Sequence, residues 1–192
     1  KELINSSKFK HIFADEIICI EHPWYNKGYF QNEVKKLPEW VIFINREIFL
    51  KKSKKFSSPR KIFLDRSTSK FNHCKIFNQS SLNKWLKKDN FSIYTPETLS
   101  QEKQICLFNN ASIILGAHGA ALTNIIFCKP GTKVIEIIPA DHPNKKCERI
   151  SKILKLKYFR IKTKPDNSDK NFPFKIHLNK RHLKIINDKI NL

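Results

Sequence analysis

His118 stands between two glycines in the segment Gly116-Ala-His118-Gly119, and three of the chain's four glycines fall within residues 116–131. An imidazole gains or loses its proton near neutral pH, so His118 could act as an acid or a base, or donate a hydrogen bond to a phosphate. Glycine permits φ > 0 or a close approach to a ligand. Alternatively, the glycines only form a turn, and His118 is a capping or hydrogen-bonded core histidine.

Two charged side chains could complete such a site. Arg66 follows the predicted strand 61–65, where its guanidinium could bind a phosphate through two N–H groups or form a surface salt bridge. Glu136 lies between apolar neighbours, where a carboxylate is costly to bury unless it is hydrogen-bonded. Its partner could be a ribose diol or a lysine. Asp141 and His142, just beyond, are weaker candidates.

The residues around His118 predict a strand, a turn and a helix. Residues 112–116 are apolar and rich in β-branched side chains, which favours a buried parallel strand. Apolar residues recur at helical spacing in 119–127, and residues 133–138 predict the next strand. In open α/β sheets, ligands bind beyond the carboxyl ends of the strands, and free N–H groups at a helix start attract anions.

Several ordered motifs resemble glycosyltransferase family 61. Residues 116–124 (GAHGAALTN) are similar to its HGAGLTN signature, although Ala121 stands where the family usually has glycine. Two further family motifs lie upstream. The family has an arginine just after a strand, which corresponds to Arg66, and a basic-x-x-Asn element, which corresponds to residues 75–78. Residues 97–111 resemble the family's E-x-LS-x-x-EQ-x-x-LF-x-x-A pattern, except that Lys103 stands between the acidic residue, Glu102, and Gln104.

The resemblance implies an inverting, metal-independent GT-B glycosyltransferase of the kind found in polysaccharide biosynthesis. Its donor would be a nucleotide-sugar of the UDP-sugar class, and its acceptor a glycan or a lipid-linked saccharide. The general base could also lie in a part of the enzyme outside this chain. His118 is the expected catalytic residue, and the expected donor-binding residues are Arg66, Gly116, His118, Gly119, Ala120, Thr123, Asn124 and Glu136, of which Thr123 and Asn124 could instead serve packing.

The order of apolar segments predicts a Rossmann-like, doubly wound parallel α/β sheet. We expect three parts: residues 1–58 as a remnant of an N-terminal acceptor lobe with a connector, 59–176 as the nucleotide-sugar-binding domain, and 177–192 as a basic C-terminal helix. Within the first part, 17–20 suit a strand, 23–28 a loop and 45–50 a helix capped by Asn45. The remaining predicted strands are 91–94 and 157–162, and the remaining predicted helices are 80–88, 100–110 (capped by Ser100) and 144–155.

Cysteine usage and hydropathy narrow the class of protein. The five cysteines are scattered, without the spacing of a zinc site or a disulfide framework, so we expect no metal and a reducing compartment. No apolar run is long enough for a membrane span. We therefore expect a cytoplasmic protein, or one peripheral to the inner face of a bacterial membrane, while a signal or anchor before Lys1 would not be visible.

The formal charge of +20 is unevenly distributed. Residues 1–90 and 144–192 carry net charges of +10 and +11, whereas residues 91–143, which include the glycine-rich segment, carry −1. This distribution, without an RNA-binding motif, predicts no specific nucleic-acid partner. The positive surface could attract an anionic donor, acceptor or membrane. Two alternatives stay open: a non-catalytic nucleotide- or sugar-binding lobe, and a basic module that binds polyanions.

Overall fold

The computed structural model describes Asp15 and residues 38–52, 58–69, 73–164, 166 and 174–192. Its centre is a sheet of five parallel strands in the order β2-β1-β3-β4-β5. The expected Rossmann-like α/β fold is confirmed. The strands are β1 (Lys61–Leu64), β2 (Ser92–Tyr94), β3 (Ile113–Ala117), β4 (Lys133–Pro139) and β5 (Lys157–Thr163).

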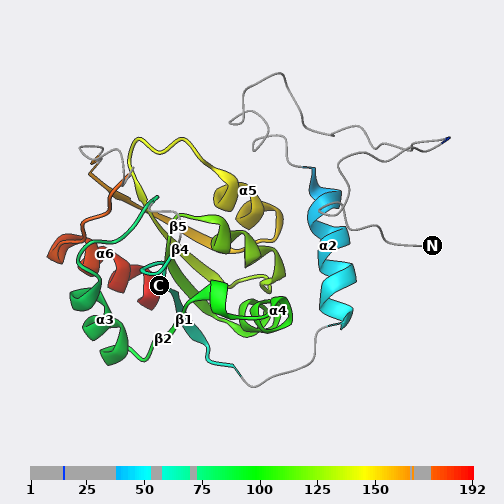
Figure 1. Ribbon diagram of the computed structural model, residues 1–192, viewed down its shortest axis with the longest axis horizontal. Coiled ribbons are helices and arrows are strands. Elements are labelled where there is room, and N and C mark those ends of the chain that lie inside the picture. The colour runs from blue at the N-terminus through cyan, green and yellow to red at the C-terminus, as the bar shows by residue number, and fades with distance from the viewer. Residues whose placement is uncertain (1–14, 16–37, 53–57, 70–72, 165, 167–173) are drawn as a thin grey trace.

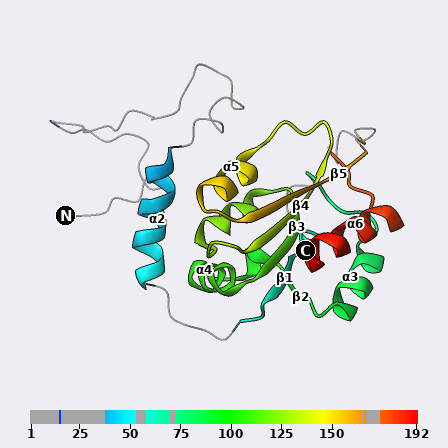
Figure 2. The same ribbon diagram turned by 180° about the vertical axis from the view of Figure 1, so that it is seen from behind.

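Helices cover both faces of the sheet (Figure 1). One face carries α3 (Gln79–Lys88) and α6 (Lys180–Asn191). The other carries α4 (Gln101–Asn110), the 3₁₀ helix η3 (Ala120–Phe127) and α5 (Lys146–Ile153), with α2 (Glu39–Lys52) outside them (Figure 2). A short 3₁₀ turn, η2 (Pro96–Thr98), precedes α4. None of the helices among the described residues has the length and apolar character needed to cross a bilayer.

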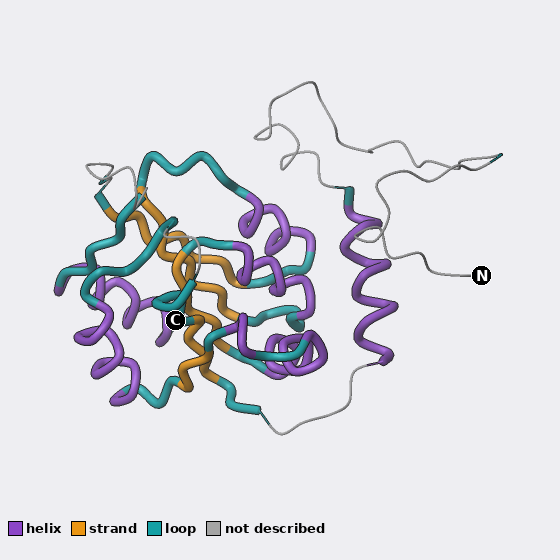
Figure 3. The backbone as a smooth tube through the Cα atoms, viewed as in Figure 1, coloured by secondary structure: helices purple, strands orange, loops and turns teal. Residues whose placement is uncertain are grey.

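Alternating strand residues build the two cores. Ile62, Leu64 and Val134 belong to the cluster beneath α4, η3 and α5, whereas Phe63 and Ile135 belong to the cluster beneath α3 and α6. Successive side chains of a strand point to opposite faces, so apolar residues at consecutive positions bury both faces. The sandwich of strands between two helical layers follows directly from these uninterrupted apolar runs (Figure 3).

The predicted elements from residue 61 onward are confirmed to within a few residues. The last predicted helix, 177–192, is shorter in the structure and begins at Lys180, where the Asn179 side chain accepts a hydrogen bond from His182 N. The oxygen of Ser100 accepts a hydrogen bond from Lys103 N, which confirms Ser100 as the cap of α4. Residues 119–127 form a 3₁₀ helix rather than an α-helix.

The prediction that Asn45 caps a helix over 45–50 is wrong. The helix α2 begins at Glu39, just after Pro38, and Asn45 lies inside it, donating a hydrogen bond of 2.7 Å to the carbonyl of Val41. The β-branched run that obscured this start is helical because it packs on η3, with Ile42 buried. The predicted strand 17–20 and loop 23–28 lie outside the described residues.

Arg46 ties α2 to the rest of the molecule. Its guanidinium donates hydrogen bonds to the carbonyls of Ile126 and Cys128 at the end of η3, the latter at 2.8 Å. Phe49 packs edge-on against Phe127, with ring centroids 6.2 Å apart. The described end of the predicted N-terminal part therefore packs on the Rossmann-like unit, and the division into three parts stays a prediction.

The strand order places a topological switch point between β1 and β3. The chain leaves β1 toward β2 on one side and later returns to β3 on the other side. Ligands of open α/β sheets bind at such a point, beyond the carboxyl ends of the two strands. The segments that follow β1 and β3 are therefore where a binding site is expected.

Candidate functional site

Arg66 and His118 lie at this switch point. Leu64, the last residue of β1, is paired with Gly116 of β3, so residues just beyond the two strands share one edge of the sheet. The amide of His118 donates a hydrogen bond of 2.8 Å to Ile137 O of β4, which fixes the backbone at the end of β3. The sheet thus brings together two residues that are far apart in the sequence.

A cleft of about 680 Å³ opens at this edge. Four predicted site residues line it together: Arg66, His118, Gly119 and Ala120. Arg66 and Lys146 contribute positive charge and Glu97 negative charge, so the cleft carries a positive excess. The other lining residues are Thr68, Ser69, His73, Ala121 and Asn144.

The guanidinium of Arg66 is only partly satisfied by the protein. Its Nη2 donates a hydrogen bond of 3.3 Å to the carbonyl of His73. Its Nε is buried and has no hydrogen-bond partner among the described residues. Within that part of the chain Arg66 also forms no ion pair, so the alternative of a surface salt bridge is not realised there. Donor capacity is left for an anion in the cleft.

Gly119 is needed for space rather than for an unusual backbone conformation. Its φ of 168° is extended, a conformation open to any residue. A Cβ at this position would lie 1.9 Å from Nη1 of Arg66. The group that approaches this glycine closely is thus Arg66 rather than the ligand we expected, whereas Gly131, with φ 82°, does need the freedom of glycine.

The first amides of η3 also face the cleft region. Leu122 N is the first amide of this turn that donates to a backbone carbonyl, that of Gly119, at 3.1 Å. Among the described residues, the N–H groups of Gly119, Ala120 and Ala121 donate to no backbone carbonyl, and these three residues line the cleft. Free N–H groups at a helix start favour an anion.

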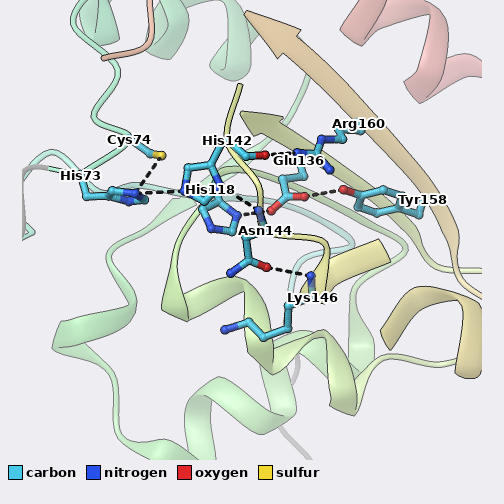
Figure 4. A network of polar contacts seen from close by, with 9 residues as sticks. All are labelled: His73, Cys74, His118, Glu136, His142, Asn144, Lys146, Tyr158 and Arg160. Atoms are coloured by element: carbon cyan, nitrogen blue, oxygen red, sulfur yellow. Dashed lines mark hydrogen bonds and ion pairs between the residues drawn. The ribbon is translucent and has the colours of Figure 1, made fainter. Parts of the chain in front are cut away.

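His118 forms a buried pair with Glu136. Its Nδ1 lies 2.6 Å from Oε1 of Glu136, and the two side chains are 6% and 2% exposed. The hydroxyl of Tyr158 donates a hydrogen bond to the other oxygen, Oε2 (Figure 4). A carboxylate only accepts, so Nδ1 carries the proton and the lone pair of a neutral ring is on Nε2.

The environment keeps Glu136 ionised. Burial acts to raise its pKa, but the hydrogen bond and charge of His118 and the hydroxyl of Tyr158 outweigh it, and the pKa is lowered. Burial and the charge of Glu136 raise the pKa of Tyr158. The suggested lysine partner of Glu136 was wrong, because His118 and Tyr158 occupy its two oxygens. A ribose diol would have to displace one of them.

Four predicted site residues lie outside the cleft lining: Glu136, Gly116, Thr123 and Asn124. Gly116 is buried in β3, where a Cβ would lie 3.2 Å from Cβ of Leu64. Asn124 donates a hydrogen bond of 2.8 Å to Oε1 of Gln104, which links η3 to α4. Thr123 is half-buried on the same turn. These positions support the loop that carries His118.

Sequence reasoning missed a cluster beside His118. Nε2 of His73 lies 3.1 Å from Nε2 of His142 and 3.8 Å from Sγ of Cys74 (Figure 4). The rings of His142 and His118 have centroids 4.3 Å apart. Burial, then the charge on His118, lowers the pKa of His73 and brings that of His142 to about 4. These residues come from two distant segments, so spacing along the chain could not reveal them.

Asp65 and Asp141 have no place in the cleft lining. Asp65 accepts hydrogen bonds from the amide and hydroxyl of Ser67, at 2.8 and 2.9 Å, and so caps the turn after β1. Asp141 is exposed, and His142 belongs to the cluster just described. Of the two weaker sequence candidates, only His142 lies beside the predicted site.

Comparison with known proteins identifies the family. The family described as Glycosyltransferase 61 matches residues 3–135, more than half of the chain. A beta-1,2-xylosyltransferase of Arabidopsis thaliana is 38% identical over 60 residues, which cover 31% of this chain and 11% of the relative. A beta-1,2-xylosyltransferase of Oryza sativa subsp. japonica is 35% identical over 63 residues, which cover 33% and 12%.

These matches span only about a ninth of the length of the two curated relatives, so they do not carry a whole enzyme's activity to this chain. The family match covers β1 and β3, whose ends form the cleft, and extends into β4, ending one residue before Glu136. The motifs, the Rossmann-like sheet and the family match agree, and the chain belongs to glycosyltransferase family 61.

Proposed function

We propose that this chain supplies the donor site of an enzyme that transfers a sugar from a UDP-sugar to a glycan or lipid-linked saccharide, with inversion. The observation that carries the proposal is the partly unpartnered guanidinium of Arg66, which lines the same cleft as the Glu136-bound His118. Membership of the family and the two xylosyltransferase relatives support glycosyl transfer as the reaction class.

The positive groups of the cleft suit the leaving diphosphate. As the bond between the anomeric carbon and the diphosphate oxygen breaks, the electron pair stays with the diphosphate. Arg66 can bind its oxygens bidentately, and Lys146 and the free amides of Gly119 and Ala120 add donors. This step draws on protein groups alone and requires no metal ion to bridge the phosphates.

His118 is suited to remove the proton from the acceptor. When the acceptor oxygen forms its bond to the anomeric carbon, its hydroxyl proton passes to Nε2 of His118. Glu136 holds the Nδ1 proton, which keeps the ring in the required tautomer and stabilises the imidazolium that forms. Tyr158 positions Glu136 without reaching the cleft lining.

We propose in addition that the sheet unit is the donor-binding lobe of a GT-B enzyme. In such an enzyme a second lobe presents the acceptor, and the site lies between the two. The net charge of +20 favours an anionic acceptor, or a location at the negatively charged inner face of a membrane.

Titration calorimetry with UDP, UMP and uridine tests the donor site. We expect UDP to bind about tenfold or more tightly than uridine, because hydrogen bonds to charged groups contribute about 1.5–3 kcal/mol. Equal affinities would contradict a diphosphate site. Heparin serves as the control, since a general polyanion surface would bind it with steep salt dependence and would be indifferent to Gly119→Ala.

Turnover needs its own measurement. Incubation with a panel of UDP-sugars and glycan acceptors should release UDP, and His118→Ala should lower the rate by a factor of about 100 or more, as expected for loss of a general base. If UDP binds and no donor is consumed, even by the complete protein, the chain is a nucleotide-sugar-binding lobe without transferase activity.

A further inference from the structure

Three potential metal ligands meet on one side of the cleft. His73 and Cys74 lie between β1 and α3, and His142 follows β4 (Figure 4). Their ligand atoms, two imidazole nitrogens and one sulfur, all lie within 4.8 Å of one another. The Nε2 atoms of the two histidines are 3.1 Å apart, and Sγ of Cys74 is 3.8 Å from Nε2 of His73.

These separations are close to those of ligands around one tetrahedral ion. Zinc bonds of about 2.0–2.1 Å to nitrogen and about 2.3 Å to sulfur place two nitrogens about 3.3 Å apart and a nitrogen and a sulfur about 3.6 Å apart. We propose that His73, Cys74 and His142 form a zinc-binding site. A thiolate with two imidazoles is a donor set that zinc prefers over magnesium or calcium.

The surroundings suit a bound ion. Cys74 is fully buried and is not in a disulfide, and His142 is 8% exposed. The ring of Phe174 packs on both histidines, with centroids 5.3 and 4.7 Å away, and so shields the cluster from water. Burial raises the pKa of the Cys74 thiol to about 12; the nearby charge of Arg66 acts to lower this pKa, and the charges of Glu136 and Asp141 act to raise it.

Binding of the ion would exchange hydrogen bonds for metal bonds. In the structure, Asn144 N donates a long hydrogen bond of 3.3 Å to Nδ1 of His142, which leaves the proton on Nε2 for His73. A zinc ion on Nε2 requires the proton on Nδ1, so both contacts are given up. The thiol of Cys74 loses its proton to solvent and becomes the thiolate ligand.

The proposed ion would join the segment after β1 to the segment after β4. It would hold His73 at the cleft, where the His73 carbonyl accepts the hydrogen bond from Arg66. With three protein ligands, a fourth position on the ion is left for water. The role we assign is positional, and it is independent of whether UDP binds.

Cobalt titration of the full chain, stripped of metal and kept reduced, tests the site. One Co²⁺ per chain should bind and give a sulfur-to-cobalt charge-transfer band, which Zn²⁺ then abolishes by displacement. Cys74→Ser should remove the band. His142→Gln should weaken metal binding by about 100-fold. Loss of a residue that only hydrogen-bonds to a metal ligand already costs up to about 100-fold in affinity, and loss of a ligand itself should cost at least as much. Zn²⁺ should raise the melting temperature of the unmutated chain and of neither variant.

The matched controls are Cys106→Ser, a buried cysteine of α4, and His177→Gln, an exposed histidine. Both should keep the cobalt band and the zinc-induced rise in melting temperature. Circular dichroism checks that each variant is folded, and His142→Gln carries the test if Cys74→Ser does not fold. Absence of the band in the unmutated chain, or its persistence in Cys74→Ser, would overturn the proposal.

Discussion

The guanidinium of Arg66 fills the space in which a side chain on Gly119 would lie. A Cβ on Gly119 would sit 1.9 Å from Nη1 and 2.4 Å from Cζ of Arg66, far inside contact distance. Arg66 follows β1 and Gly119 follows the neighbouring strand β3. Only a residue without a Cβ at position 119 leaves room for the side chain of Arg66 in the cleft.

Gly119→Ala is predicted to weaken UDP binding by roughly 10- to 100-fold. The new methyl group cannot share the space of the guanidinium, so Arg66 must move and lose its contact with the diphosphate, worth about 1.5–3 kcal/mol for a charged hydrogen-bonding group. Titration calorimetry of the variant with UDP measures the loss. An affinity equal to that of the unmutated chain would contradict this role of Gly119.

A double-mutant cycle supplies the control. If Gly119→Ala acts by displacing Arg66, it should cost little further affinity in a chain that already carries Arg66→Ala. Fully additive losses would mean that the two residues act independently, and the steric account would then be abandoned.

Tyr158→Phe is predicted to destabilise the fold by about 1–3 kcal/mol. The change removes a hydroxyl that donates to Oε2 of Glu136 and leaves a buried carboxylate oxygen without that partner. Urea unfolding measures the loss. The control is Tyr94→Phe, because Tyr94 is half-buried and its hydroxyl has no partner among the described residues. We expect this change to alter the free energy of unfolding by no more than about 0.5 kcal/mol. Equal effects of the two changes would argue against the Tyr158 bond.

Glu136 should make part of the stability depend on pH. His118 and Tyr158 hold the pKa of its carboxyl below the ordinary value of 4.5, so the unfolded chain takes up this proton first as the pH falls. The contribution is complete above about pH 4.5 and is lost as the pH falls through the lowered pKa. Urea unfolding between about pH 6 and about pH 3 should show a flatter dependence of stability on pH for Glu136→Gln. An unchanged slope would mean that the pKa is not lowered.

Asn124→Ala is predicted to cost stability and to spare UDP binding. Asn124 donates to Gln104, which in turn donates to the carbonyls of Pro96 and Leu99, and none of these four residues lines the cleft. Loss of the hydrogen bond should cost about 1 kcal/mol of unfolding free energy. Urea unfolding and UDP titration of the same sample separate the two effects. Weaker UDP binding at unchanged stability would instead place Asn124 in contact with the donor.

The sheet could be predicted because its signal is local. Uninterrupted apolar runs such as that of β3 indicate strands that are buried on both faces of the sheet. The segments between them have apolar residues at helical spacing, or helix caps such as Ser100. The start of α2 was missed because its β-branched residues favour a strand, and only packing on η3 decides for a helix. The order of strands, and hence the switch point between β1 and β3, is set by tertiary packing.

The candidate site was predictable in part. Arg66, His118 and Gly119 carry local motifs, and the sheet brings them together as expected. The partners of Glu136 were missed because His118 follows β3 and Tyr158 lies on β5, the two strands that flank β4, and this relation depends on strand order and register. The cluster of His73, Cys74 and His142 likewise joins two distant segments, so only the fold reveals it.

The central claim is that Arg66 holds the diphosphate of the donor, and UDP titration of two matched variants tests it most directly. Arg66 follows β1, and Arg60, an exposed arginine, precedes the same strand at its other end, so either change to alanine removes one positive charge. We predict that Arg66→Ala weakens UDP binding by about tenfold or more and that Arg60→Ala leaves it within about twofold. UDP binding that is unchanged in Arg66→Ala, or weakened equally in both variants, would contradict the account.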